Sequence, residues 1–248
     1  MKQSKAKPEA PPEYGRSFAT TGEEVVQEIR ARNPVCLISF SRGKDAIATY
    51  LSIRDHFDRV VPYTYTLVPD LEFVEESTQY YEKMMGCRIL RFPNPNFYNM
   101  LRMHVYQPPN RCNLINSMQL ESYDHDDLQF AVCEDAGLDY EKTFNALGMR
   151  AKDSMMRALY FQRAGPVNYK RNIFYPVFDW SKQRLMDAIK HAGWKLPVDY
   201  KVWTSSFDGL YLNYVYQIKK HFPRDYQRIL HWFPLVEMEI HRYEASLK

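Results

Sequence analysis

The sequence predicts an α/β fold, a doubly wound and mostly parallel sheet with a helical C-terminal extension. Strand-like and helix-like segments alternate between residues 34 and 92, which implies crossover connections between parallel strands. The 248 residues, 45% hydrophobic and 25% charged, suit one sizeable soluble domain. We therefore expect a mobile tail at residues 1–18, a main domain at 19–200 and the extension at 201–248.

The first half of the chain supplies the alternation. A tail rich in Lys, Pro and Glu precedes a helix that Thr20 or Thr21 caps and that places Val25, Val26 and Ile29 on one face. The elements then expected are a strand at 34–40, a helix at 46–57, a strand at 60–67, a helix at 72–85 and a strand at 87–92.

The second half is less regular because prolines interrupt residues 91–139. Helices are expected at 114–120, 126–134 and 181–191, and a strand at 143–147. From residue 207 the chain is helical in pattern, over 209–221 and 225–243, with Pro234 interrupting the last helix. The aromatic-rich apolar stripe of this end is expected to pack on the sheet or to contact a protein partner, including a second copy of the chain.

A short polar loop follows the first strand and predicts a phosphate site. Ser39 and Phe40 end the strand, and the sequence continues as Ser41-Arg42-Gly43-Lys44-Asp45-Ala46. The glycine lets the backbone approach a ligand, the lysine adds a positive charge, and the next helix directs its positive end at the same place. The loop is not a Walker A motif, because Ile38 stands where that motif has its first glycine.

A second constellation follows the strand expected at 143–147. Gly148 permits a close turn at the strand end, and the guanidinium of Arg150 can hold a phosphate or sulfate through two hydrogen bonds. Asp153 and Ser154 suit the cap of the next helix, and Arg157 lies one turn further on. Together with the first loop, these residues predict a two-sided anion site.

Both motifs resemble those of one superfamily. Residues 41–46 resemble the SGGKDS pyrophosphate loop of the N-type ATP pyrophosphatases, which include phosphoadenosine phosphosulfate (PAPS) reductase and the small subunit of ATP sulfurylase. Arg42 replaces the first glycine of that loop and Ala46 its last serine. Residues 148–157 resemble the family's G-x-R-x-x-E-S-x-x-R motif, with Asp153 for glutamate. The resemblance implies an adenine nucleotide alpha hydrolase-like fold, with residues 19–200 as a PAPS reductase-like nucleotide-binding domain.

The resemblance also implies a ligand and a reaction. The ligand would be ATP, or PAPS or adenylyl sulfate, with magnesium, and the reaction would be adenylyl transfer at the α-phosphate with release of pyrophosphate. Lys44, Arg150 and Arg157 would be the catalytic residues. The nucleotide would contact residues 39–45 together with Gly148, Arg150, Asp153 and Ser154. Sulfonucleotide reduction is less favoured, because relatives of that type use a cysteine near the carboxyl terminus and no cysteine follows Cys133.

Other acidic and thiol groups give weaker indications. Asp45 and Asp70 are candidate magnesium ligands, although Asp70 equally suits the cap of the helix at 72–85. The run at residues 124–127 favours a helix start over a metal site. Cys87 lies in a strand-like apolar run and is expected to be buried, whereas Cys112 follows a basic loop and is either a reactive or a passive thiol.

Composition leaves two further classes of function open. The net charge of +3 permits a nucleotide or a nucleic acid as ligand but requires neither. The alternatives are a non-catalytic nucleotide-binding or regulatory module, and a nucleic-acid modification factor that uses adenylation chemistry with partner proteins. The sequence has no apolar stretch of membrane-spanning length and no secretory leader, so we expect a cytoplasmic protein without membrane contact.

Overall fold

The computed structural model describes residue 17 and residues 19–246, so all but one residue of the predicted mobile tail lies outside the described residues. Its centre is a six-stranded sheet in the order β3-β2-β1-β4-β6-β5. The strands are β1 (Val35–Ser39), β2 (Arg59–Thr66), β3 (Leu90–Pro93), β4 (Phe144–Ala146), β5 (Val167–Asn168) and β6 (Ile173–Phe174). Only the pair β5 and β6 is antiparallel among the described strands, so the prediction of a mostly parallel α/β sheet is confirmed.

The chain reverses its direction of travel across the sheet at β1. From β1 it moves to β2 and β3 on one side, then crosses to β4 on the other side. Ile38 pairs with Ala146 at the carboxyl ends of β1 and β4, so the loops that follow these two strands start side by side. Parallel α/β sheets bind ligands in the crevice at such a switch point, and here it lies between the two predicted motifs.

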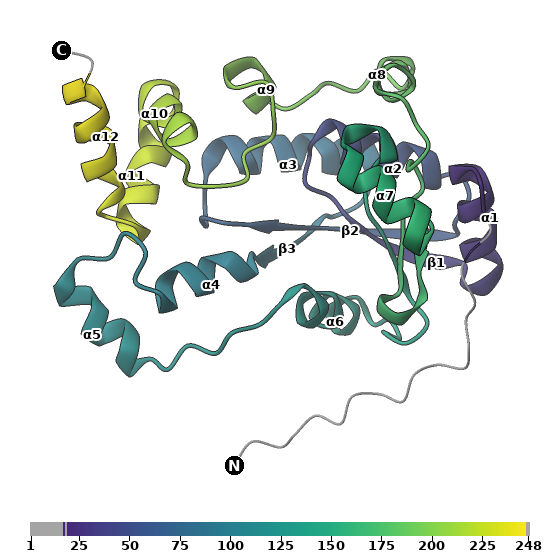
Figure 1. The fold of residues 1–248 in the computed structure, drawn as a ribbon, viewed down its shortest axis with the longest axis horizontal. Coiled ribbons are helices and arrows are strands. Elements are labelled where there is room, and N and C mark those ends of the chain that lie inside the picture. The colour runs from purple at the N-terminus through teal and green to yellow at the C-terminus, as the bar shows by residue number, and fades with distance from the viewer. Residues whose placement is uncertain (1–16, 18, 247–248) are drawn as a thin grey trace.

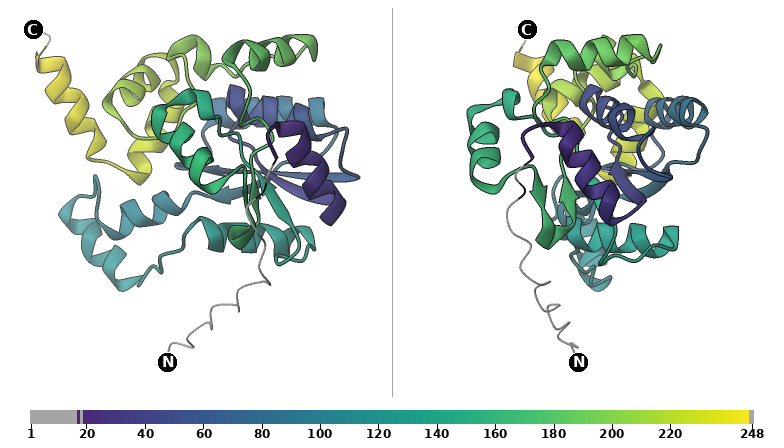
Figure 2. Two further views of the ribbon diagram at one scale, coloured as in Figure 1. Left: turned by 45° about the vertical axis from the view of Figure 1, so that its right-hand side comes forward. Right: turned by 90° about the vertical axis from the view of Figure 1, so that its right-hand side faces the viewer.

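Helices cover both faces of the sheet (Figure 2). They are α1 (Gly22–Arg32), α2 (Lys44–Ile53), α3 (Glu72–Met85), α4 (Pro95–Arg102), α5 (Pro109–Ser117), α6 (His125–Ala136), α7 (Met155–Ala164), α8 (Lys182–His191), α9 (Asp199–Val202), α10 (Leu212–His221), α11 (Pro223–Trp232) and α12 (Val236–Ser246), with short 3-10 turns at Ala151–Asp153 and Tyr169–Arg171. Helices α1, α2, α3 and α8 form the main core with Cys36 and Ile38 of β1. Helix α6 covers Leu37 and Val61 on the opposite face, so β1 is buried on both sides.

Several boundaries differ from the predictions for local reasons. Helix α2 begins at Lys44, directly after Gly43, instead of at residue 46. Gly86 ends α3 with a φ of 69°, and β3 starts only at Leu90. Cys87 consequently lies in the exposed turn between them, so the prediction that it is buried is wrong. The helix start expected near residues 124–127 is confirmed, because Asp124 and Asp127 form a capping box at the start of α6.

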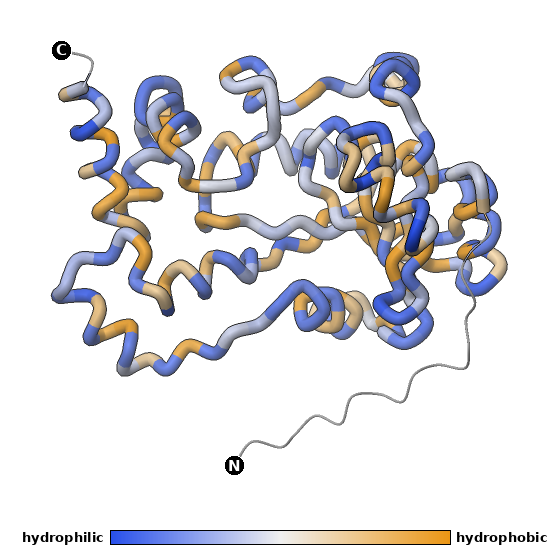
Figure 3. The backbone as a smooth tube through the Cα atoms, viewed as in Figure 1, coloured by the Kyte–Doolittle hydropathy of each residue, from blue (hydrophilic) through white to orange (hydrophobic). Residues whose placement is uncertain are grey.

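The C-terminal helices pack on the chain itself at one end of the molecule (Figure 1). Ile229 of α11 and Phe233, which directly follows that helix, form a second core with Leu71, Phe73 and Phe97 near the starts of α3 and α4. Figure 3 accordingly shows hydrophobic positions gathered both around the strands and along the C-terminal helices. The stripe predicted for a partner or for the sheet is therefore used within the chain, beside the sheet. None of the helices in the described part of the chain combines the length and apolar character that a bilayer crossing requires.

The N-terminus of α3 is capped by a residue from α11. Asp225 accepts hydrogen bonds from the backbone N–H of Glu72 at 2.7 Å and of Phe73 at 3.2 Å. Arg228 donates to both Asp225 and Glu72, each at 2.8 Å. Leu71 occupies the N-cap position and Asp70 precedes it with a φ of 60°, so the alternative of a cap by Asp70 is wrong. The carboxylate that serves this helix lies 153 residues along the chain from Glu72.

We predict that Asp225→Ala lowers the free energy of unfolding by about 2–3 kcal/mol, because it removes a buried cap, leaves two backbone N–H groups without an acceptor and leaves Arg228 with Glu72 alone. Urea denaturation of the full chain measures the effect. Asp58→Ala is the matched control: it breaks the exposed ion pair with Arg30, which contributes about 0.5 kcal/mol. Equal effects of the two substitutions would refute the capping role.

Candidate functional site

The first motif forms the turn between β1 and α2. Phe40 is fully buried, its N–H donates to the carbonyl oxygen of Tyr63 at 2.7 Å, and its ring packs edge-on against Tyr81. The ring of Phe40 therefore belongs to the core, and only its backbone reaches the turn. From Ser41 onward the chain leaves the sheet and bends into the first turn of α2, as the sequence predicted.

Arg42 turns its side chain into the protein. Its φ of 64° lies in the left-handed region, which glycine adopts most easily. Glycine is also the residue that the SGGKDS pattern has at this position. The side chain is 4% exposed, and its Nη1 donates to the carbonyl oxygen of Val74 in α3 at 3.3 Å. Its Nε has no hydrogen-bond partner among the described residues. Burial lowers the pKa of Arg42, an effect opposed by the nearby Asp199, Tyr81 and Glu75.

Three hydroxyls lie close to the start of α2, and two of them accept from its N–H groups. The N–H of Gly43 donates weakly to Ser41 Oγ at 3.4 Å, and the N–H of Lys44 donates to the Tyr200 hydroxyl at 3.0 Å. A Cβ added to Gly43 would lie 3.1 Å from Ser206 Oγ. Tyr200 and Ser206 come from α9 and the loop after it. Residues 199–208, called the C-terminal segment below, therefore lie directly over the predicted phosphate loop.

Five charged side chains join the two motifs in one chain of ion pairs. Asp45 accepts from Lys44 on one oxygen and from Arg150 Nε on the other, the latter at 2.8 Å. Arg150 also donates to Asp153, which pairs in turn with Arg157 at 2.6 Å. The Arg150 side chain is 3% exposed, whereas Lys44 is 23% and Arg157 46% exposed. Within this chain of ion pairs, Lys44 and Arg157 are therefore the accessible cations, and Arg150 is the buried link between the two motifs.

Gly148 allows the second motif to lie against the first. A Cβ at this position would come within 2.9 Å of the carbonyl carbon and oxygen of Asp45, and 3.0 Å from Thr49 Oγ1. Thr49 itself donates to that carbonyl at 2.8 Å. The glycine thus permits direct contact between the end of β4 and the first turn of α2, a tighter constraint than the turn predicted from the sequence.

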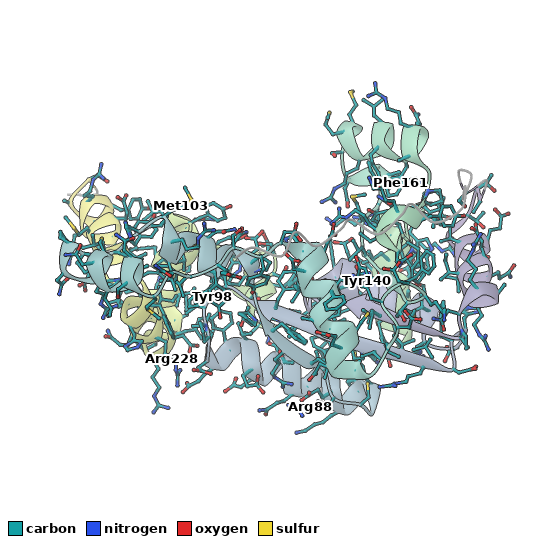
Figure 4. The ribbon with its side chains drawn as sticks, turned by 90° about the horizontal axis from the view of Figure 1, so that it is seen from below. Arg88, Tyr98, Met103, Tyr140, Phe161 and Arg228 are labelled. Atoms are coloured by element: carbon teal, nitrogen blue, oxygen red, sulfur yellow. The ribbon has the colours of Figure 1, made fainter. Side chains whose placement is uncertain are left out.

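The remainder of the second motif starts helix α7. Ser154 Oγ accepts from the N–H of Arg157 at 3.2 Å, so this serine caps the helix as predicted. Helix α7 stands out from the body of the molecule, with Phe161 at its base (Figure 4). Met155 and Met156 on its first turn are 79% and 76% exposed.

The two predicted magnesium ligands lie in different surroundings. Both oxygens of Asp45 are held by cations, whereas Asp70 lies in the loop after β2 and lines a separate groove with Thr64 and Phe92. Within the described residues, no group of three or more His, Cys, Asp or Glu side chains is arranged to hold a metal ion. Asp45 and Asp70 therefore do not form one magnesium site, because cations hold both oxygens of Asp45 and Asp70 lines the other groove.

A cavity of about 130 Å³ adjoins the phosphate loop at the carboxyl ends of β1 and β2. Its wall combines apolar side chains with a few polar ones, as ligand pockets do. The lining residues are Ser41, Arg42, Tyr65, Thr66, Leu67, Val68, Leu71, Val74, Asn94, Ser206, Phe207 and Asp208. The last three belong to the C-terminal segment.

Residues of the site that the sequence analysis missed come from this same segment. Residues 200–208 are rich in hydroxyl and aromatic side chains, and this was the available signal. No spacing rule connects them to the loop at residues 41–44.

Cys112 is the thiol for which the sequence allows either a reactive or a passive role. Its Sγ donates to the carbonyl oxygen of Pro108 at 3.5 Å, within its own helix turn. The structure thus places Cys112 in a local backbone contact of α5, away from the ion-pair chain.

Comparison with known proteins gives a similarity of structure only. No family model matches the chain, and no curated protein matches it. The U34-tRNA thiolase NcsA from Methanococcus maripaludis is similar with a TM-score of 0.45 and 12% identity, over 87% of this chain and 78% of that one. The NH3-dependent NAD synthetase from Campylobacter jejuni is similar with a TM-score of 0.40 and 11% identity, over 92% of this chain and 95% of that one. At these values the likeness identifies neither a family nor an activity.

We predict that Gly148→Ala costs about 1–3 kcal/mol of stability, because its new methyl group meets backbone atoms that cannot yield. Gly43→Ala is the matched control, since its methyl group meets only side-chain hydroxyls, the nearest being that of Ser206 at 3.1 Å, and its φ of −68° suits alanine. We expect that control to cost less than about 1 kcal/mol. Urea denaturation without ligand compares them, and a Gly148→Ala protein as stable as the control would contradict the close contact.

Proposed function

We propose that this chain binds an adenine nucleotide between the β1 and β4 loops and transfers its adenylyl group. The observation that carries the proposal is the Asp45–Arg150 ion pair, which joins the two predicted motifs at the switch point of the sheet. A parallel sheet presents its binding crevice at this edge, and the first turn of α2 directs backbone N–H groups into it. The resemblance of both motifs to those of N-type ATP pyrophosphatases supports adenine nucleotides as the ligand class.

The site suggests an orientation for the ligand. The phosphates would lie over Gly43 and Lys44, where the accessible ammonium group and the N–H groups favour anions. The base would enter the adjoining cavity, where Thr66 and Asn94 offer polar contacts among apolar neighbours. Arg157 is the exposed cation available to the other end of the ligand.

The proposed reaction is attack on the α-phosphorus of ATP by an oxygen or nitrogen of an acceptor. The new bond to the acceptor forms as the bond between the α-phosphorus and the bridging oxygen breaks. Pyrophosphate leaves with that electron pair, and the acceptor's proton passes to solvent. Lys44 would stabilise the negative charge that develops on the leaving pyrophosphate. Arg150 would act as a positioning residue, because Asp45, Asp153 and the carbonyl oxygen of Trp180 already use its guanidinium.

We predict that ATP raises the melting temperature of the protein by several degrees at a concentration of about one hundred times Kd, equivalent to about 2.7 kcal/mol. Lys44→Ala should weaken ATP binding by about tenfold or more, because it removes an accessible cation from the phosphate site. Lys190→Ala, on the exposed end of α8, is the control and should bind like the wild type. Thermal melting and calorimetric titration provide the two measurements. The absence of any response to ATP, PAPS or adenylyl sulfate would refute the proposed ligand class.

Turnover is a separate outcome of the same proposal. With ATP and either sulfate or an alkyl amine as acceptor, we expect release of pyrophosphate that depends on the acceptor and falls at least tenfold in Lys44→Ala. Stabilisation by ATP without pyrophosphate release, for every acceptor tried, would support a non-catalytic nucleotide-binding module in place of the transferase. Salt-dependent binding of DNA would support the third class, a nucleic-acid modification factor.

A further inference from the structure

We propose that the C-terminal segment at residues 199–208 completes the phosphate-binding site, with the hydroxyls of Tyr200 and Ser206 as ligand-binding groups. The inference rests on the proposed function, since it concerns the same nucleotide phosphates. It adds residues that neither motif contains, from a segment that spans the boundary predicted at residue 200 between the main domain and the extension.

The first observation is the contact between Tyr200 and the start of α2. The N–H of Lys44 donates to the Tyr200 hydroxyl at 3.0 Å, so this oxygen acts as the acceptor and its own proton remains available for another partner. Burial raises the pKa of Tyr200, which keeps the phenol protonated at neutral pH. A hydroxyl polarised by a backbone donor is a stronger donor itself. Tyr200 would thereby extend the positive end of α2 to a phosphate oxygen.

The second observation lies in the adjoining cavity. Ser206 lines it together with Ser41 and Arg42. Ser206 Oγ also lies close to Gly43, 3.1 Å from where a Cβ on that glycine would stand. Arg42 is only 4% exposed, and its Nε has no hydrogen-bond partner among the described residues. A buried guanidinium group in the wall of this cavity adds positive charge, which favours an anionic ligand there. Hydroxyl and guanidinium donors thus surround one side of the loop.

The third observation is that the segment is held in place. Asp199 is fully buried and accepts from the N–H of Phe207 at 3.0 Å, which closes residues 199–207 into a loop. Trp203 and Phe207 pack edge-on against Phe73 of α3, with ring centroids 5.9 Å and 5.7 Å away. The second core therefore fixes both hydroxyls over the phosphate loop before any ligand arrives, which lowers the entropy cost of binding.

The experiment compares Tyr200→Phe and Ser206→Ala with the wild-type chain by calorimetric titration of ATP and of pyrophosphate. We expect Tyr200→Phe to weaken both ligands about tenfold and Ser206→Ala to weaken them at least threefold, with melting temperatures near that of the wild type. Tyr211→Phe is the matched control, because Tyr211 is 64% exposed in the following loop. It should leave both affinities unchanged.

The outcomes separate this inference from the proposed function. A wild-type chain that binds ATP, together with unchanged binding in both variants, would overturn the inference and leave the proposed function standing. Tighter binding in Tyr200→Phe would also overturn it, because the hydroxyl would then compete with phosphate for the Lys44 N–H. A wild-type chain that binds neither ATP nor pyrophosphate would overturn both proposals.

Discussion

The buried guanidinium of Arg150 is the interaction on which the arrangement of the candidate site depends. A cation at 3% exposure is costly unless it is paired, and Arg150 is paired with Asp45 from the first motif and Asp153 from the second. Two loops more than 100 residues apart in sequence are therefore held at one crevice by a single side chain. The close approach at Gly148 allows this pairing, since any side chain there would separate β4 from the first turn of α2.

A second set of long-range contacts connects the C-terminal helices to the same crevice. Asp225 of α11 caps α3, and the aromatic residues of the second core hold the segment that covers the phosphate loop. The site is consequently built from both cores: the main one positions β1, α2 and β4, and the second one positions Tyr200 and Ser206. A description of residues 19–200 alone would include Tyr200, its last residue, but would leave out Ser206 and the aromatic residues that hold this segment in place.

Local patterns in the sequence predicted most of the fold, whereas features that depend on contacts between distant residues could not be predicted. The bounds of α3 and the parallel alternation through β3 followed from periodicity and flanking turn residues, because these signals are local. Strands β5 and β6 have only two residues each, too few for a period-two pattern, and their pairing depends on β4. The motifs predicted the residues that meet at the switch point. They could not predict that Arg42 turns inward, because that depends on Val74 and Asp199, or that Tyr200 reaches Lys44.

The cap that α11 provides for α3 has a consequence for folding during synthesis. Chains emerge from the ribosome amino terminus first, so the N–H of Glu72 cannot bond to the Asp225 carboxylate until 153 further residues have been made. Until α11 has emerged, the first turn of α3 and the apolar residues of the loop after β2 remain exposed. The high sequence separation of these contacts favours slow completion of the fold, and a nascent chain halted before residue 225 would present an uncapped helix and an open apolar surface to chaperones.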